Sequence, residues 1–206
     1  MAIISVLLVA VIPAFNLTKS SGRKGAISNL LGAIEQGRAQ AIKDGRPTYV
    51  VFATTLSTTD QNIIQRYLYR SVAIFKDDPA NPSDHADPND PADTTKSKIQ
   101  VSTWKILPTG VSIRPSVGAS PWKQATFAFT PEGSTATENF SYLMFNANGE
   151  VQSPDPTPAT AVTITVFEGF VNGTIEVVTG KKDGSGNPLA AESITVARLT
   201  GRAERM

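Results

Sequence analysis

The most acidic stretch of the chain could supply oxygen ligands for a metal ion. Residues 77–98 read DDPANPSDHADPNDPADTTKSK, a run with six aspartates and four prolines. Calcium prefers carboxylate oxygens, but the ligand spacing of an EF-hand loop and its closing bidentate glutamate are absent. We therefore interpret the stretch as a solvated surface loop whose like charges repel one another, with calcium binding as the alternative. Its aspartates are Asp77, Asp78, Asp84, Asp87, Asp90 and Asp93.

Histidine and serine occur without the partners that catalysis needs. His85 is the only histidine and lies in the acidic stretch, so we expect an exposed loop side chain. The sequence contains no Gly-x-Ser-x-Gly elbow, Walker motif or dinucleotide-binding motif. The absence of cysteine excludes a thiol nucleophile, a thiolate metal site and a disulfide framework. We predict no enzymatic activity, cofactor, metal site or small-molecule substrate.

Cations near the end of the chain could contact phosphate groups. Arg202 and Arg205 follow Arg198, and the pair Lys181-Lys182 lies upstream. However, the 206 residues include 19 basic and 18 acidic ones, and no aromatic residue alternates with these cations. We interpret the region as a solvated terminal strand and keep nucleic-acid contact through Arg202 and Arg205 as the alternative.

The element that opens the chain is apolar. It reads MAIISVLLVAVIPAF, and the first charged residue is Lys19. A helix that spans the hydrocarbon core of a bilayer needs about 20 apolar residues, so this run is borderline in length. A cleaved signal peptide needs a basic region before its apolar run, and none precedes this one. The helical pattern instead continues beyond the run, which favours one longer helix.

The following residues are typical of an amphipathic helix. Apolar side chains recur at spacings of three and four, with polar residues mostly on the other side. Gly45 and Pro47 then give a stop signal, with Gly45 as the C-cap. We predict one helix from residue 1 to about 43, which Pro13 can bend, and whose first third must be buried in lipid or among other helices. The predicted apolar stripe consists of Ile27, Leu30, Leu31, Ile34, Ala41 and Ile42.

Two segments resemble known proteins. The run MAIISVLLVAVIPAF is similar to the later part of the hydrophobic N-terminal helix of type IV pilins and pseudopilins, with Pro13 in the place of the family's helix proline. Residues 39–52, AQAIKDGRPTYVVF, resemble the helix end and first strand of minor pseudopilins of the GspH/FimT type. The glycine and acidic residue of the prepilin processing site are missing, which puts processing by prepilin peptidase in doubt for the polypeptide as written.

This resemblance implies a minor pseudopilin, a structural subunit of a type II secretion or type IV pilus-like envelope filament that assembles through its N-terminal helix. Such a subunit is a single-pass protein of the bacterial inner membrane, with its C-terminal domain in the periplasm or cell envelope. Its partners are other pilin-like subunits, whose helices replace lipid around its own helix on assembly. The residues expected to face lipid and then these helices are Ile3, Ile4, Val6, Leu7, Leu8, Val9, Val11, Ile12 and Pro13.

The end of the chain suggests an alternative function. Residues 199–206, LTGRAERM, resemble the Gly-Arg-x-Arg tail of FimT-type pseudopilins, whose arginines are tied to DNA contact. Here Arg205 lies one place later than the family's second arginine, and Glu204 intervenes. The alternative is a membrane-tethered β-domain that binds DNA or a surface polysaccharide, and a third hypothesis is an anchored structural domain without a filament. Trp122 would serve a binding module if exposed, but we expect Trp104 and Trp122 to pack in the core.

The remainder of the chain is predicted to be β-rich. We predict an α+β fold in which the long N-terminal helix packs on an antiparallel sheet or sandwich. Residues 1–46 would form the membrane and assembly helix, and residues 47–206 the globular domain, with a disordered loop at 77–98 and a second loop at 153–160. We expect residues 111–114 to pair behind 98–107, a hairpin at Asn148-Gly149, and 193–199 to pair with 173–179. The predicted strands are residues 48–53, 63–75, 98–107, 111–114, 125–130, 140–145, 162–167, 173–179 and 193–199.

Overall fold

The fold was determined as a computed structural model. Its backbone is described for residues 2–78, 98–117, 120–131, 136–153 and 162–206. Side chains are described for residues 22–78, 98–115, 122–131, 136–152 and 162–206. His85, most of the acidic stretch and residues 154–160 of the predicted loop 153–160 lie outside these ranges, whereas Ser153 ends a strand.

A single long helix, α1 (Ala2–Asp44), opens the chain and continues through Pro13. This confirms the predicted helix and its end. Gly45 has a φ of +63°, and the Arg46 amide donates to the Ala41 carbonyl at 3.3 Å, which closes the helix in a Schellman motif. Within the described residues, no helix combines the length and apolarity that a membrane crossing needs.

Two antiparallel sheets follow. The first has seven strands in the order β3-β2-β1-β8-β7, with β4 beside β2 and β9 beside β8. Its strands are β1 (Thr48–Phe52), β2 (Ser71–Asp77), β3 (Lys98–Gln100), β4 (Lys105–Ile106), β7 (Gln124–Phe129), β8 (Ala136–Phe145) and β9 (Val151–Ser153). The second has six strands in the order β13-β12-β10-β5-β6, with β11 beside β10. Its strands are β5 (Val111–Val117), β6 (Ser120–Pro121), β10 (Val162–Asn172), β11 (Ile175–Val178), β12 (Glu192–Val196) and β13 (Ala203–Arg205). The α+β fold class is thereby confirmed.

The alternation of side chains along β1 divides the interior into two cores. Val50 and Phe52 face α1 and the second sheet, where Leu30, Ile34 and Ile164 are fully buried. We call this cluster the helix core. Tyr49 and Val51 face the other way, into a cluster that we call the aromatic core. Because both faces of β1 are covered, every residue of this strand is buried.

The aromatic core lies inside the curl of the first sheet. Edge strand β3 lies close to edge strand β7, and Thr130 donates to Gln100 across the gap at 3.1 Å. Trp104 packs edge-on against Phe140, with ring centroids 5.1 Å apart, and also contacts Phe75 and Phe129. A short helix, α2 (Gln61–Tyr67), adds Ile64 and Tyr67 to this core.

Several predicted strands are wrong in type or pairing. Residues 63–67 of the predicted strand 63–75 instead belong to α2, because the Asp60 side chain accepts the Asn62 amide and caps the helix. The predicted strand 98–107 is interrupted between β3 and β4. Strand β5 does not pair behind it but joins the second sheet beside β10.

The predicted pairing of residues 173–179 with 193–199 is also wrong. β10 extends to Asn172, turns at Gly173 with a φ of +60°, and pairs with its own continuation β11. β12 instead lies between β10 and the C-terminal strand β13. The predicted hairpin at Asn148-Gly149 is confirmed between β8 and β9, with Gly149 at a φ of +78°.

Candidate functional site

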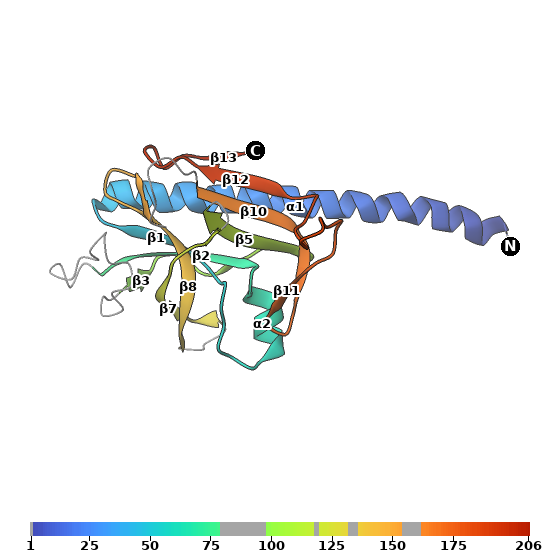
Figure 1. Cartoon of the computed structure of the whole chain (residues 1–206), viewed down its shortest axis with the longest axis horizontal. Helices are drawn as coiled ribbons and strands as arrows, with labels where there is room; N and C mark the ends of the chain where they lie inside the picture. The colour runs from blue at the N-terminus through green and yellow to red at the C-terminus, as the bar shows by residue number, and fades with distance from the viewer. Residues whose placement is uncertain (1, 79–97, 118–119, 132–135, 154–161) are drawn as a thin grey trace.

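The predicted assembly residues lie in the first part of α1. Figure 1 shows that this part projects beyond both sheets, with the N-terminal end of the helix far from the β-strands. The backbone is helical throughout the range from Ile3 to Pro13, but side chains are described only from residue 22 onward. The role of Ile3, Ile4, Val6, Leu7, Leu8, Val9, Val11, Ile12 and Pro13 in assembly therefore stays a prediction.

The second part of α1 packs on the domain through the predicted stripe. Ile27, Leu30, Ile34 and Ala41 are buried and Leu31 is partly buried, which confirms these positions. Ile42 is 46% exposed, so its assignment to the buried stripe is wrong. It lies at the margin of the helix core, against the turn that contains Gly149. Three small residues outside the predicted stripe, Ala26, Ala33 and Gly37, complete the buried face.

Small residues allow α1 to approach the strands closely. A Cβ at Gly37 would lie 2.5 Å from Val50 Cγ2, so only glycine fits where α1 crosses β1. At Gly201 a Cβ would meet the Gly149 carbonyl oxygen and would lie 2.9 Å from Phe145 Cε1. Gly201 also has a φ of +63°, which disfavours any other residue. Glycine thus brings the C-terminal loop, the β8–β9 turn and α1 together.

Polar contacts complete this junction. Arg38 of α1 donates from Nε to the Thr200 carbonyl at 2.6 Å and forms an ion pair with Glu35 at 3.6 Å. Glu35 in turn accepts the Ala203 amide at 3.3 Å. Residues 200–205 therefore lie beside α1, and Figure 1 shows β13 running along the helix. We call this segment the strap.

The two tail arginines differ in their surroundings. Arg205 lies in β13 and forms an ion pair with Glu192 of β12 at 2.5 Å. Glu204, on the same strand, is exposed. Arg202 is exposed in the strap and has no side-chain partner among the described residues. A paired arginine next to a carboxylate is poorly suited to phosphate contact, so the structure favours the interpretation as a terminal strand.

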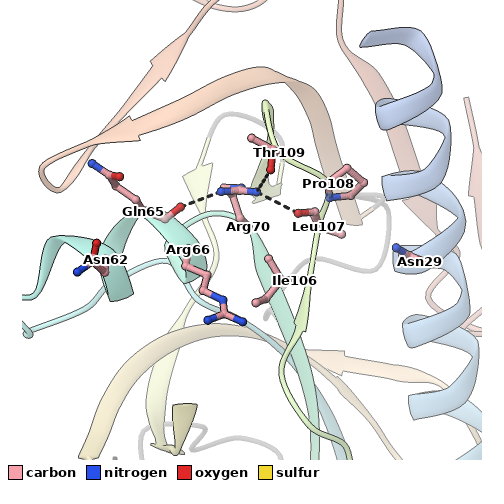
Figure 2. Close-up of a pocket in the computed structure, with 9 residues that line it drawn as sticks. All are labelled: Asn29, Asn62, Gln65, Arg66, Arg70, Ile106, Leu107, Pro108 and Thr109. Carbon is pink, nitrogen blue, oxygen red and sulfur yellow. Dashed lines mark hydrogen bonds between the residues drawn. The ribbon is translucent and has the colours of Figure 1, made fainter. Parts of the chain in front are cut away.

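An open groove of about 620 Å³ lies between α1 and α2. Figure 2 places Asn29 of α1 and Asn62 of α2 on opposite sides, with Arg70 and the 106–109 segment between them. Pro108 packs towards the backbone of α1, since a Cβ at Gly25 would lie 3.9 Å from its ring. The lining consists of Asn29, Asn62, Gln65, Arg66, Arg70, Ile106, Leu107, Pro108 and Thr109.

Arg70 is held in a fixed position at the centre of this groove. Its guanidinium donates to the carbonyls of Gln65 at 2.9 Å and Leu107 at 3.1 Å, and to the Thr109 hydroxyl at 3.5 Å. Partial burial lowers the pKa of Arg70 from its ordinary value. The preceding residue, Tyr69, has a φ of +54°, a left-handed conformation that is rare for an aromatic residue. Nothing in the sequence indicated that arginines would gather here or that Tyr69 would adopt a left-handed conformation.

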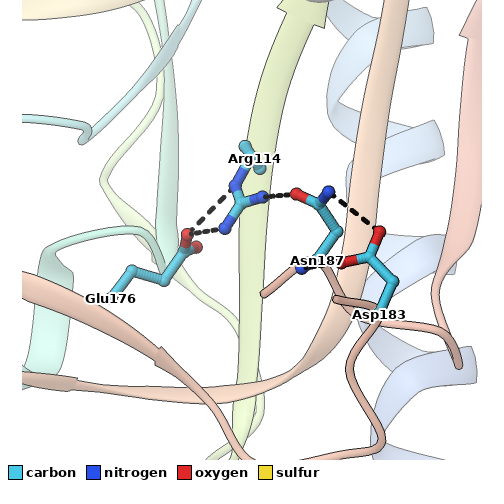
Figure 3. Close-up of polar contacts among 4 residues, drawn as sticks. All are labelled: Arg114, Glu176, Asp183 and Asn187. Atoms are coloured by element: carbon cyan, nitrogen blue, oxygen red, sulfur yellow. Dashed lines mark hydrogen bonds and ion pairs between the residues drawn. The ribbon is translucent and has the colours of Figure 1, made fainter. Parts of the chain in front are cut away.

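A second polar cluster fixes the periphery of the second sheet. Figure 3 shows Arg114 of β5 between Glu176 of β11 and Asn187, which also contacts Asp183. Arg114 donates to the Glu176 carboxylate at 2.8 Å and to Asn187 at 3.4 Å. Burial raises the pKa of the Glu176 carboxyl, and the ion pair with Arg114 offsets this only in part. These contacts tie β11 and the 183–187 turn to β5, which is a structural role.

Asp77, one of the candidate calcium ligands, already has a protein partner. It ends β2, is 3% exposed and accepts the Tyr49 hydroxyl at 2.8 Å. Burial, together with the Asp77 charge, raises the pKa of Tyr49, so this hydroxyl keeps its proton. Lys98 begins β3, and its ammonium lies 5.3 Å from the centre of the Phe127 ring. The two ends of the predicted loop 77–98 are therefore strand residues, and Asp84, Asp87, Asp90 and Asp93 lie outside the described residues.

The remaining candidate features are structural. Among the described residues no group of three or more His, Cys, Asp or Glu side chains is arranged to hold a metal ion. Trp122 is 3% exposed and packs edge-on against Phe52, with ring centroids 5.3 Å apart. Trp104 is partly buried in the aromatic core. The predicted packing roles of both tryptophans are confirmed, and the exposed binding role considered for Trp122 is wrong.

Comparison with known proteins places the chain in a family. Residues 26–191 match the family of type II transport protein GspH. Searches of curated proteins and of solved structures found no match. The matched range begins within α1 and ends before β12, so it covers the aromatic core and most of the helix core, and leaves the apolar start of α1, β12 and the tail arginines outside. With most of its length matched, this chain belongs to the GspH family of type II transport proteins, the pseudopilin-like components of type II secretion.

Proposed function

We propose that this protein is a minor pseudopilin that assembles into a type II secretion or type IV pilus-like filament through the first part of α1. The observation that supports this proposal is the projection of an apolar helix segment beyond a domain to which its second part is firmly packed. A helix that is apolar on nearly all sides needs an apolar environment. Lipid provides it before assembly, and neighbouring helices provide it afterwards.

The proposed location follows from the same argument. The first part of α1 anchors the subunit in the bacterial inner membrane as a single pass, and the β-domain lies on the periplasmic side. The role of the protein is structural, and its partners are other pilin-like subunits. GspH family membership supports an envelope-associated role in type II secretion.

An anchor exchange tests this proposal. Residues 1–21 are replaced by an unrelated single-pass membrane helix, and the variant is expressed in cells that lack the native protein. We expect the exchanged protein to stay in the membrane but to lose its support of secretion, because an unrelated helix anchors without packing specifically against other subunits. A matched control returns the native residues 1–21 in the same expression context.

The alternative is a tethered β-domain that binds DNA or a surface polysaccharide. It predicts that any anchor suffices, so retained function in the exchanged protein would contradict filament assembly through α1. The Arg205–Glu192 ion pair and the burial of Trp122 count against this alternative, because they engage two of its candidate binding residues within the domain. We therefore prefer the filament subunit.

A further inference from the structure

The connection between β11 and β12 lies where α1 leaves the domain. Figure 1 shows it at the end of the domain from which the first part of α1 projects. Arg23 of α1 donates from its guanidinium to the Ala190 carbonyl at 2.6 Å and pairs with the Glu168 carboxylate of β10 at 3.7 Å. We call residues 181–190 the lysine loop. These contacts tie the lysine loop to α1 beside the projecting segment.

The lysine loop presents two cations and one large apolar side chain. Lys181, Lys182 and Leu189 are exposed, and Leu189 retains 65% of its accessible surface. An antiparallel bridge joins Lys182 to Pro188 across the loop. The Leu189 amide donates to the Lys181 carbonyl at 2.7 Å, which brings these two residues side by side. Within the described part of the chain, neither lysine forms a side-chain hydrogen bond or an ion pair.

The one carboxylate of the loop is occupied by its own turn. Asp183 accepts the backbone amides of Ser185 at 2.9 Å and Asn187 at 2.8 Å, and the Asn187 side-chain amide at 3.0 Å. Figure 3 shows Asn187 also in contact with Arg114 of β5. Lys24, exposed on α1 next to Arg23, adds another cation at this end of the domain. The surface around the α1 exit is therefore positive overall.

The helix sets the height of the lysine loop relative to a bilayer. α1 is continuous from Ala2 to Asp44, and the first charged residue along it is Lys19. At about 1.5 Å per residue, Arg23 lies about 6 Å beyond Lys19 along the helix axis. The headgroup layer on each side of the hydrocarbon core is about 5–8 Å thick. When the apolar run occupies the hydrocarbon core, Arg23 and the loop tied to it lie at the outer edge of the headgroups.

This combination of charge and apolar surface suits an anionic membrane better than a nucleic acid. Each lysine near an anionic lipid surface strengthens binding about fivefold. An apolar side chain between lysines gains further by entering the headgroup layer, whereas it gains little beside a hydrated nucleic-acid backbone. Binding to a nucleic-acid backbone also uses a longer row of phosphate contacts than these few cations provide.

We propose that the lysine loop docks on anionic lipid headgroups while α1 anchors the subunit in the membrane. Lys181 and Lys182 contact lipid phosphates, and Leu189 enters the headgroup layer. The contact fixes the orientation of the β-domain on the membrane before assembly. It rests on the single-pass anchor of the proposed function, because the anchor brings the loop to the bilayer.

Headgroup quenching on the full chain tests the proposal. Ser185→Cys introduces a single thiol at the exposed tip of the lysine loop, and a bimane label on it reports contact with lipids that carry a nitroxide on the headgroup. The labelled chain is reconstituted into vesicles of phosphatidylcholine alone or of equal parts phosphatidylcholine and phosphatidylglycerol. We expect strong quenching in the anionic vesicles and weak quenching in the neutral ones. High salt should remove the difference, because it screens the charges.

Variants of the lysine loop set the expected size of the effect. Lys182→Gln should lower the ratio of docked to free loop about fivefold, and Lys181→Gln combined with it about 25-fold. The midpoint of thermal unfolding should not change, because both side chains are exposed. Lys43→Gln removes an exposed cation near the other end of α1 and should leave the quenching unchanged. A label at Ala147→Cys, in the exposed β8–β9 turn, is the positional control and should stay unquenched.

The outcomes separate the loop from the anchor. Equal quenching in neutral and anionic vesicles, no effect of the two lysine substitutions, or equal quenching of the Ala147→Cys label would each overturn the proposal. Flotation of the same vesicles reports the anchor independently. A chain that floats but shows no quenching at Ser185→Cys would mean that the loop assignment is wrong and the anchored function stands. A chain that floats with neither vesicle would overturn the anchor, and the loop assignment with it.

Discussion

The two halves of α1 differ in what covers their apolar side chains. Residues 22–44 bury a stripe on two sheets and expose residues such as Lys24 and Glu35 on the other side. Residues 2–21 belong to the same helix but extend past the sheets, and their first eleven residues include only one polar side chain, Ser5. A helix with a polar face can complete its packing within one chain, whereas one without it needs a second apolar environment. The packed half is therefore expected to control stability and the projecting half assembly.

The largest expected effect comes from a charge in the projecting half. Val9→Asp should reduce secretion at least about tenfold, because a carboxylate near the centre of an apolar helix costs about 2.5–3.5 kcal/mol on insertion. The midpoint of thermal unfolding of the β-domain should not change. Ser28→Asp, on the exposed face of the packed half, is the matched control and should retain secretion. Wild-type secretion by Val9→Asp, measured together with its level in the membrane, would remove the distinction between the halves.

The packed half should show the reverse behaviour. Ile34 is fully buried in the helix core, so Ile34→Ala should lower the free energy of unfolding by about 2–5 kcal/mol. Urea unfolding measures this loss, with Ser28→Ala as a control expected to stay within about 0.5 kcal/mol of the native chain. A loss in Ile34→Ala no greater than that of the control would mean that α1 is not held by this core.

A pair of glycines sharpens the role of the C-terminal strap. Gly201 and Gly173 have nearly equal φ angles, +63° and +60°, but only Gly201 has neighbours close to the position of an added Cβ. Gly173→Ala should cost about 1 kcal/mol for its left-handed backbone alone. Gly201→Ala should cost about 2–3 kcal/mol, because a methyl group there displaces the strap from Gly149 and Phe145. Equal losses in urea unfolding would show that the close approach contributes nothing to stability.

The smallest expected effect concerns pH at the end of α1. Asp44 accepts hydrogen bonds from Lys76 and from Gln40, each at 2.8 Å, and these contacts lower its pKa below the ordinary value of 3.8. A carboxyl with a lowered pKa in the folded state stabilises the protein above its unfolded pKa. This contribution is lost as the pH falls through the folded pKa.

Asp44→Asn should therefore lower stability slightly at neutral pH and leave it unchanged at a pH well below 3.8. Thermal unfolding across this pH range measures the difference between the two chains. A difference that persists at the lowest pH would mean that the Asp44 charge is not responsible for the contact's contribution.

Local signals explain what the sequence predicted correctly. The end of α1 depends on Gly45 and Pro47, which act through neighbouring backbone alone. The β8–β9 turn likewise depends on Gly149. The spacing of apolar residues predicts the buried stripe of α1. The one wrongly assigned residue, Ile42, lies where the helix passes the edge of the core. Periodicity indicates a face of the helix but not where the covering sheet ends.

Tertiary context explains the errors and omissions. Residues 63–67 include β-branched and aromatic residues, yet Asp60 caps them as a helix, and the spacing of Ile64, Tyr67 and Leu68 is helical. The helical spacing is therefore visible in the sequence, but the β-propensity of these residues outweighs it in the prediction. The α1–α2 groove had no comparable signal, because Arg70 reaches its centre only through the left-handed turn at Tyr69. The pairing of Arg205 with Glu192 depends on the order of strands in the second sheet, which spacing does not encode.

Cysteine crosslinking of the projecting half tests the central claim most directly. The chain has no cysteine, so Val6→Cys and Val9→Cys each introduce a single thiol. In cells that carry the other filament subunits with cysteines at matching depths of their helices, filament assembly through α1 predicts crosslinks from both positions to those subunits. Ala39→Cys, on the exposed face of the packed half, is the matched control. Its thiol is accessible but lies outside the part of α1 that is proposed to assemble. Crosslinks confined to Ala39→Cys, or none at any position despite normal membrane levels, would contradict assembly through the first part of α1.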